Sequence, residues 1–383
     1  MENIANLLIF DKKMKVPIIG AYSTGFGDLW DKDIGDLLEE AGINALKSAG
    51  ISAKDVDALY IANVFSSKIN GHAPLSSLCF ERIGISRSIC ISSGDASGAV
   101  AIEEAANLIL SGAAKYAMVI GAEKSTDLKT NEMLAVAQDT IDEKEESFIG
   151  ATVQSLFAII TRKYMSDFGF ARDDLSFITI NSHKNGATNE FAQFRFELDI
   201  NKINSSAFIA DPIKVLDCSP YCDGASAIIL CSNDAVEKRK GKVLGYLLGS
   251  GIASMPASLS KRKSITIIDS TANAAAEAYK KAGLSPKEIG LIEAYDIVPV
   301  SGILSIEDMG FADKGKGIEF IKKHPRAVNP SGGLKSCGHA IGATGIRQAV
   351  DIIKKLKEMD IKFGISNTMS GTGSISAVNI YGV

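Results

Sequence analysis

The sequence predicts an α/β fold built from two related βαβ halves, and three observations support this prediction. Strand-like segments alternate with longer amphipathic segments typical of helices, which indicates crossover connections and mixed sheets covered by helices. The segment AGISAKDV (49–56) returns as AGLSPKEI (282–289). The segment SGDASGAVAI (93–102) returns as CGHAIGATGI (337–346), with five of ten residues identical. Because both pairs keep their order along the chain, the sequence indicates a duplication.

The expected elements follow the same order in both halves. In each half a helix leads through the repeated turn into a strand, and a glycine-rich corner then precedes an amphipathic helix and a further strand. The expected helices span 36–50, 101–112, 271–283 and 346–359, and the expected strands span 56–64, 116–123, 289–298 and 362–369.

The division between the halves is expected near residue 240, where a polar connection precedes a new strand at 243–252. This gives an N-terminal half over residues 1–240 and a C-terminal half over residues 241–383. Residues 125–210 have no counterpart of similar length in the second half. We therefore expect this region to be an inserted loop or lid.

The composition is that of an ordinary soluble globular protein, with 46% hydrophobic and 22% charged residues in a chain of 383. The formal net charge of −4 argues against a nucleic-acid-binding protein, and the longest basic cluster, 261–263, is typical of a solvated loop. The apolar patch in residues 1–13 is too short to span a membrane and lacks a cleavage-site pattern. We therefore expect neither a nucleic acid nor a membrane as a partner.

The chain has no CxxC pair among its six cysteines, which lie at 79, 90, 218, 222, 231 and 337. Cys218 and Cys222 lack a second pair of ligands at zinc spacing, so we expect no metal site. Free thiols in a reducing cytoplasm are the expectation, and Cys90, on an incoming strand, is expected to be buried.

Two residues with acid–base chemistry occupy equivalent places in the repeat. Asp95 stands on a strand–turn–helix corner of the first half, and His339 stands at the same position of the second. Corners of this kind often carry a nucleophile, because the corner residue points outward at a helix N-terminus. If the halves pack around a pseudo-twofold axis, carboxylate and imidazole face one central site and form a usable acid–base pair. Helix capping is the structural alternative for Asp95.

Five segments carry a resemblance to a known family. They are GAYSTGFG (20–27), SGAAKYAMVIGAEKSTD (111–127), NSHKNGATNEFAQFR (181–195), LDCSPYCDGASAIIL (216–230) and, most specifically, NPSGGLKSCGHAIGATG (329–345). On these residues the chain, from Val16 to Val383, resembles the thiolase superfamily, most closely its archaeal and sterol-carrier-protein-type members.

The resemblance implies a duplicated thiolase fold with layers in the order α-β-α-β-α. It also implies an acyl-CoA substrate, in which coenzyme A is part of the substrate and no separate cofactor is required. A homodimer or a dimer of dimers is implied, and so is a small zinc-ribbon/OB-fold partner protein of the kind that archaeal thiolases use.

The chain departs from the family pattern at three of four catalytic positions. Where family members form an acyl-enzyme on a cysteine, this chain has Asp95. The family's His-Asp-x-Phe motif reads YDIV, so that Tyr295 replaces the oxyanion-hole histidine and stands beside Asp296. The second cysteine corresponds to Ser370. The histidine of the Gly-His-Pro motif remains as His339, although alanine follows it.

These substitutions change the expected chemistry. A carboxylate is a weak nucleophile, and its attack on a thioester would give a mixed anhydride that is less stable than the thioester. Asp95 can instead act as a base at the α-carbon of an acyl-CoA, while Tyr295 and His339 polarise the carbonyl and Asp296 lines the cleft. This set suits aldol or retro-aldol chemistry without a covalent intermediate. The alternatives are a non-catalytic thiolase-like scaffold or regulatory subunit, and a carrier of CoA esters or lipids.

Further candidates lie in two glycine-rich segments. Cys337, two residues before the retained histidine, is the thiol that could reach the site, and packing is its alternative role. Gly371 and Gly373, which follow Ser370, could offer backbone amides as an oxyanion hole, but a tight turn explains them equally well.

Two residues of the segment 181–195, which resembles the covering loop of the family, complete the set. His183 and Asn185 are candidate substrate or lid contacts. For His183 a solvent-facing position in a polar loop is the alternative.

Overall fold

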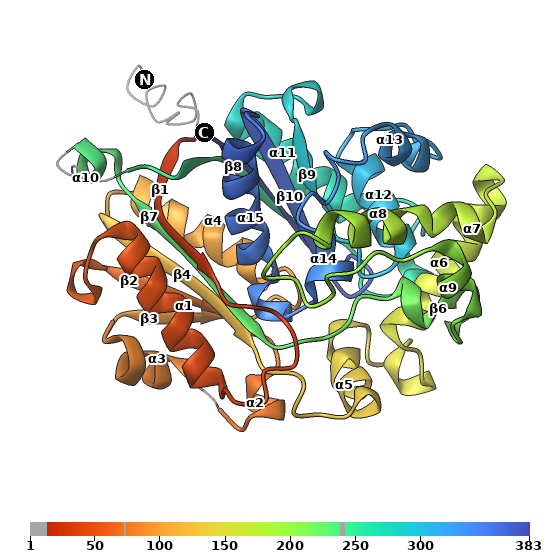
Figure 1. The fold of residues 1–383 in the computed structure, drawn as a ribbon, viewed down its shortest axis with the longest axis horizontal. Coiled ribbons are helices and arrows are strands. Elements are labelled where there is room, and N and C mark those ends of the chain that lie inside the picture. The colour runs from red at the N-terminus through yellow and green to blue at the C-terminus, as the bar shows by residue number, and fades with distance from the viewer. Residues whose placement is uncertain (1–13, 73, 238–241) are drawn as a thin grey trace, which may run out of the picture.

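The computed structural model describes residues 14–72, 74–237 and 242–383, and within them a nine-stranded mixed sheet forms the centre (Figure 1). The strands lie in the order β3-β2-β4-β7-β1-β8-β11-β10-β9. Their bounds are β1 Val16–Ser23, β2 Ala58–Ala62, β3 Ser88–Ile91, β4 Tyr116–Glu123, β7 Gly224–Cys231, β8 Gly245–Ser254, β9 Leu291–Glu293, β10 Phe363–Ser370 and β11 Ile375–Gly382. The apolar patch at 1–13 and the division near residue 240 lie outside the described residues.

Strand pairing repeats across the middle of this sheet. On one side β2 lies parallel to β3 and β4, and β7 and β1 continue antiparallel. On the other side β9 lies parallel to β10 and to a bridge at Val328, and β11 and β8 continue antiparallel. The two sides join where Val16–Ile18 pair antiparallel with Gly245–Leu247. Both halves therefore share one topology, related by a pseudo-twofold axis between β1 and β8.

The repeated turn has nearly the same backbone in both halves. Helix α1 (Ile34–Ala49) ends at Gly50, with φ 63° and ψ 37°, and α11 (Asp269–Ala282) ends at Gly283, with φ 64° and ψ 38°. A left-handed residue closes each helix, and glycine adopts this conformation without strain. The match found in the sequence is thus a match in conformation.

Helices cover the sheet and divide the molecule into layers (Figure 1). α1 and α3 (Leu75–Ile83) pack on the outer face of the first half, and α11 and α12 (Pro299–Asp308) pack on the outer face of the second. α4 (Ser97–Leu110) and α15 (Thr344–Glu358) lie between the half-sheets and contact strands of both. The order of layers is the expected α-β-α-β-α.

The central hydrophobic core lies between the half-sheets. α4 contributes Ile102 and Ile109, and α15 contributes Ile346, Ile353 and Leu356, spaced three or seven residues apart on one helix face. Each fully buried aliphatic side chain of this kind contributes about 1.5–3 kcal/mol to stability. This core fixes the two helices whose first residues follow the glycine corners.

The inserted region between β4 and β7 is mainly helical. A tight turn at 371–374 joins β10 to β11, whereas residues 124–223 separate β4 from β7. The elements here are α5 Thr130–Ala137, α6 Val153–Phe168, α7 Arg172–Leu175, α8 Phe177–Gly186, α9 Ile200–Ser205, β5 Phe208–Ala210 and β6 Ile213–Lys214. Because α6 and α8 pack on α12, this region covers the C-terminal half beside the site.

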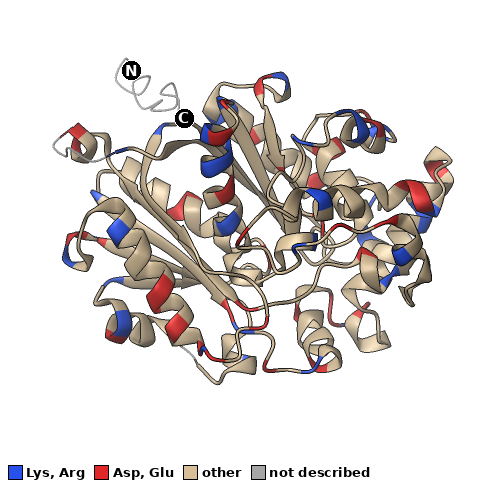
Figure 2. Ribbon diagram, in the orientation of Figure 1, with Lys and Arg blue, Asp and Glu red and all other residues tan. Residues whose placement is uncertain are grey.

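Short helices complete the fold, namely α2 Ser66–Ile69, α10 Asn233–Glu237, α13 Gly317–Lys323 and α14 Gly333–Cys337. No helix in the described ranges is long and apolar enough to cross a bilayer. The same part of the chain contains no group of histidine, cysteine and acidic residues arranged to hold a metal ion. Acidic and basic residues are interspersed over the helices of both halves (Figure 2).

The two corners pack against each other through glycines. A Cβ on Gly98, in the first turn of α4, would lie 3.0 Å from the carbonyl oxygen of Gly342, its counterpart in the repeat. A Cβ on Gly345 would lie 2.5 Å from the backbone nitrogen of Ala99. The two backbones therefore pack directly against each other, which brings the corner residues Asp95 and His339 within hydrogen-bonding distance.

Gly345→Ala is expected to lower the free energy of unfolding by about 1–3 kcal/mol, because the backbone of Ala99 lies too close to accommodate the new methyl group. Gly25→Ala is the matched control, since no atom lies within 4 Å of the position of its Cβ. Urea denaturation of both variants measures the difference. Equal, small shifts of the two midpoints would show that the corners are not in tight contact.

Candidate active site

Asp95 occupies the corner between β3 and α4, but it does not cap the helix. The N-cap residue of α4 is Ala96, and no side chain bonds to the exposed amides there. Ser97 Oγ instead accepts from the Ser93 amide at 2.8 Å and closes the turn. Gly94 has a positive φ of 55°, which turns the chain so that Asp95 points into the protein. The carboxylate is thereby free to contact the other half.

Asp95 Oδ2 contacts both Tyr295 and His339. The Tyr295 hydroxyl donates a hydrogen bond to it, and His339 Nε2 lies 3.4 Å from the same oxygen. The rings of Tyr295 and His339 meet edge to face with centroids 5.8 Å apart. The three residues the sequence placed at the reaction centre are thus in mutual contact.

The hydrogen bonds of His339 hold its ring between Thr344 and Asp95. Its Nδ1 is 2.8 Å from Thr344 Oγ1, and that hydroxyl donates its own proton to the Ala340 carbonyl at 3.1 Å. Thr344 therefore accepts from Nδ1–H, and Nε2 is left facing the Asp95 carboxyl. A proton on either of these two atoms makes the contact a hydrogen bond between the halves.

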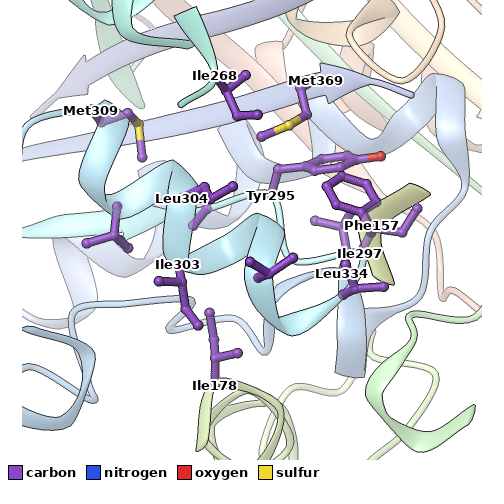
Figure 3. Packing of buried hydrophobic residues seen from close by; sticks show 14 of the residues in the cluster. Phe157, Ile178, Ile268, Tyr295, Ile297, Ile303, Leu304, Met309, Leu334 and Met369 are labelled. Carbon is purple, nitrogen blue, oxygen red and sulfur yellow. The ribbon is translucent and has the colours of Figure 1, made fainter. Parts of the chain in front are cut away.

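Burial sets the state of Tyr295. Its side chain is fully buried among apolar residues that include Phe157 and Met369, and its oxygen lies at the edge of this cluster (Figure 3). Burial, together with the charge of Asp95, raises the pKa of the Tyr295 phenol well above its ordinary value. Tyr295 therefore keeps its proton and acts as a hydrogen-bond donor or acid.

Asp296, the residue after Tyr295, forms its hydrogen bonds with other segments than the Asp95 corner. Its Oδ1 accepts from the Leu334 amide at 2.6 Å, and its Oδ2 accepts from Ser182 Oγ at 2.8 Å. These bonds tie α14 to α8 beneath the site, so Asp296 is a positioning residue. These hydrogen bonds explain why a charged residue is buried shortly after β9.

The cysteines differ from the expectations in one respect. Cys337 is buried and donates to the Ser331 carbonyl at 3.2 Å, and burial raises the pKa of its thiol to about 12. Its sulfur also accepts from Asn189 Nδ2 at 3.5 Å, so its hydrogen bonds are with Ser331 and Asn189. The expectation that Cys90 is buried is wrong, because strand β3 is the edge of the sheet and leaves that side chain exposed.

The turn at 371–373 touches the corner through one residue. Ser370 Oγ occupies the place where a Cβ on Gly94 would lie, so the hydroxyl sits directly against the Asp95 corner. Gly373 donates its amide to the Ser370 carbonyl at 2.8 Å, and Gly371 packs on the Thr140 carbonyl. The Gly373 amide is therefore occupied within the turn.

His183 and Asn185 do not lie in a loop. Both belong to α8, and His183 is 1% exposed, with Nδ1 3.0 Å from the Phe196 carbonyl and its ring stacked on Phe194. Burial lowers the pKa of His183 to about 4 and keeps it neutral. Asn185 donates to backbone carbonyls, including that of Asn329 at 3.0 Å. Both residues hold the covering region in place.

Asp95, Tyr295 and His339 are called the triad below. A cavity of about 470 Å³ opens next to them. Residues 125–134, which follow β4, and segment 215–221 form most of its walls, and Gln154 and Lys335 project from α6 and α14. Asp223 fixes the first of these walls by accepting the amides of Ser125 and Thr126 at 2.7 and 2.9 Å.

Tyr221 separates the cavity from the triad. Its ring stacks on His339 with centroids 5.9 Å apart and planes 28° apart, and the neighbouring Pro220 carbonyl accepts from the His339 amide at 2.9 Å. Among the described residues that line the cavity, Tyr221 is the one in contact with the His339 ring. A ligand in the cavity meets this phenol before it meets Asp95.

Two lining residues could not be recognised in the sequence. Nothing in the sequence distinguishes Tyr221 from the other residues of its family motif, or Lys335 from an ordinary lysine in a glycine-rich loop. Lys335 is 3% exposed, and its Nζ donates to the Cys218 carbonyl at 2.6 Å. One signal in the sequence could have indicated its burial. Lys335 stands between a glycine pair and a run of small residues, and segments of such small residues pack closely enough to enclose a long side chain.

Comparison with known proteins identifies the family. A model described as "Thiolase, N-terminal domain" matches residues 16–234, and one described as "Thiolase C-terminal domain-like" matches residues 251–382. The chain is 35% identical over 381 residues to an acetyl-CoA acetyltransferase of Methanothermobacter thermautotrophicus, covering 96% of this chain and 99% of the relative. It is 28% identical to human sterol carrier protein 2, covering 90% of this chain and 66% of that protein.

Solved structures agree on the fold. The structure named "Ltp2-ChsH2(DUF35) aldolase" superposes with a TM-score of 0.81 at 22% identity, covering 97% of this chain and 98% of that one. The resemblance seen in the sequence is confirmed. The chain belongs to the thiolase family.

Proposed function

We propose that this protein is an acyl-CoA enzyme that makes or breaks a carbon–carbon bond through an enolate, without an acyl-enzyme on cysteine. The observation that carries the proposal is the contact of Asp95 Oδ2 with both Tyr295 and His339. A base, a phenol donor and an imidazole on one oxygen provide the proton transfers that enolate chemistry requires. The relatives named as acetyl-CoA acetyltransferases support an acyl-CoA substrate.

In this proposal the cavity holds the thioester, and its carbonyl passes Tyr221 to reach the triad. A cavity of about 470 Å³ with a mostly apolar lining suits the pantetheine arm and acyl chain. The Tyr221 side chain turns aside when the substrate enters. Coenzyme A is part of the substrate, and the chain's own residues supply the acid and base.

Retro-aldol cleavage of a β-hydroxyacyl-CoA illustrates the steps. Asp95 takes the proton of the β-hydroxyl group, the Cα–Cβ bond breaks, and its electron pair moves onto the thioester as an enolate. Tyr295 and protonated His339 donate hydrogen bonds to the enolate oxygen, and Cα then takes the proton from Asp95. The reverse sequence forms the bond. Preorganised donors in a buried site stabilise the developing charge more than water would.

A non-catalytic subunit is the second candidate, and one observation favours it. Asp95 is already bonded to Tyr295, and the triad lies behind Tyr221 rather than on the cavity wall. A thiolase-like subunit that binds an active relative, or a carrier of CoA esters, would keep this arrangement without turnover.

Partners and location belong to the same proposal. A homodimer would form through β3, the sheet edge, beside the exposed Ile89 and Phe80. A small zinc-ribbon/OB-fold partner is supported by the similar aldolase structure, whose name includes a DUF35 component. Phe148 and Ile149, 86% and 75% exposed in the inserted region, offer it an apolar surface. The reduced thiols of Cys79, Cys90 and Cys337 fit a reducing cytoplasm.

Asp95→Asn and Tyr295→Phe are each expected to slow exchange of the α-protons of butyryl-CoA in D2O by about 10²–10⁴-fold, because each removes one proton-transfer group. NMR of the ester measures the rate. Cys337→Ala is the control and is expected to retain the wild-type rate, since that thiol is buried and bonds to Ser331 and Asn189.

Two outcomes would count against the enzyme proposal. Absence of exchange by the wild-type protein would favour the non-catalytic subunit. Loss of exchange in Cys337→Ala, with a covalent acyl group detected by mass spectrometry, would show that a thiol carries the reaction.

Ile89→Asp is expected to convert a dimer to a monomer in sedimentation velocity, because a charge would be buried where two β3 edges meet. Met359→Asp is the matched control: it places the same charge on a residue that is 37% exposed after α15, compared with 38% for Ile89. A wild-type protein that sediments as one chain, or equal behaviour of both variants, would exclude this interface.

A further inference from the structure

Lys335 places a buried cation in the wall of the cavity. Its side chain is 3% exposed, and its Nζ lies 5.8 Å from the centroid of the Phe194 ring. The Cys218 carbonyl, at 2.6 Å, accepts one of its hydrogen bonds. An ammonium group has three donors, so donors remain for a ligand in the cavity that Lys335 lines.

The carboxylates near Lys335 are bonded elsewhere. Asp217 accepts from the Arg172 guanidinium at 2.5 Å and from Ser176 Oγ at 3.2 Å. Asp296 accepts from Ser182 and from the Leu334 amide. Within the described ranges Lys335 therefore forms no ion pair of its own.

A buried ammonium without an anion is unfavourable, and burial lowers the pKa of Lys335 to about 8. At neutral pH the group is still largely protonated. A ligand that brings a negative group to it would supply the missing partner.

We propose that the cavity takes an acyl-CoA whose acyl chain carries a second, free carboxylate, and that Lys335 binds this carboxylate. The inference rests on the proposed acyl-CoA function and specifies its substrate class. Segment 218–221 contacts Lys335 through its first carbonyl and His339 through the Pro220 carbonyl. The Cys218 and Pro220 carbonyls are two residues, at most about 7 Å, apart, a span that accommodates an acyl chain of about five carbons counted from the thioester carbon to the carboxylate carbon.

The acyl chain is a better source of the anion than the CoA phosphates. Lys335 is almost inaccessible to solvent and lies near the residues that contact His339, at the reacting end of the cavity. Lys129 lines the same cavity but is exposed. Phosphate groups are strongly hydrated, so an exposed lysine binds them more easily than a buried one.

Isothermal titration with glutaryl-CoA, valeryl-CoA and free CoA tests the proposal, because the two esters have equal chain length and differ in one carboxylate. The wild-type protein is expected to bind glutaryl-CoA about ten-fold more tightly than valeryl-CoA, or better. Lys335→Met is expected to abolish this preference while changing valeryl-CoA binding by less than about two-fold. Lys335→Arg is expected to retain the preference in part.

Lys129→Met is the matched control, since it removes the same charge from the exposed part of the cavity. It is expected to weaken both esters and free CoA alike and to keep the preference for the dicarboxylic ester. If Lys335→Met does not fold, the wild-type comparison and the Lys335→Arg variant still decide the question.

Equal affinity of the wild-type protein for the two esters would overturn the inference and leave the proposed function standing. Equal weakening of both esters and free CoA by Lys335→Met would also overturn it, because that result assigns Lys335 to a phosphate. Failure of any CoA ester to bind would reject the proposed function itself.

Discussion

The close contact between the two glycine corners is the constraint on which the site depends. Gly98 and Gly345 let backbone approach backbone across the pseudo-twofold axis, and this brings residues 95 and 339 together from half-chains 244 positions apart. Buried Glu123 supports the arrangement by accepting the Gly342 amide at 3.0 Å and the Phe65 amide at 3.0 Å. A side chain at either glycine would separate the halves and with them the acid from the base.

In the proposed function, a carboxylate at this corner gives the thiolase geometry a different chemistry. A thiolate would attack a carbonyl, whereas Asp95 lies 3.4 Å from His339 Nε2 and accepts a hydrogen bond from Tyr295. The phenol keeps its proton because it is fully buried. In the proposed function this contact serves proton transfer in place of covalent acyl transfer, and Asp95, Tyr295 and His339 form one connected group of residues.

The duplication and the contact of Asp95 with His339 could be predicted from the sequence, because a pseudo-twofold axis brings matching positions of two repeats to one central site. It was not sufficient for His183, since polar neighbours suggested a loop where α8 buries the ring against Phe194. Lys335 and Tyr221 could not be predicted either, because the burial of a side chain in a cavity wall depends on segments distant in sequence. Local patterns do not contain that information.

A crystal structure with bound butyryl-CoA tests the central claim most directly. We expect the Tyr221 side chain to turn aside and the thioester carbonyl to lie within about 3–3.5 Å of a donor on Tyr295 or His339. A thioester that stays on the cavity side of an unmoved Tyr221, with the triad closed behind it, would contradict the claim that Asp95, Tyr295 and His339 carry out the reaction.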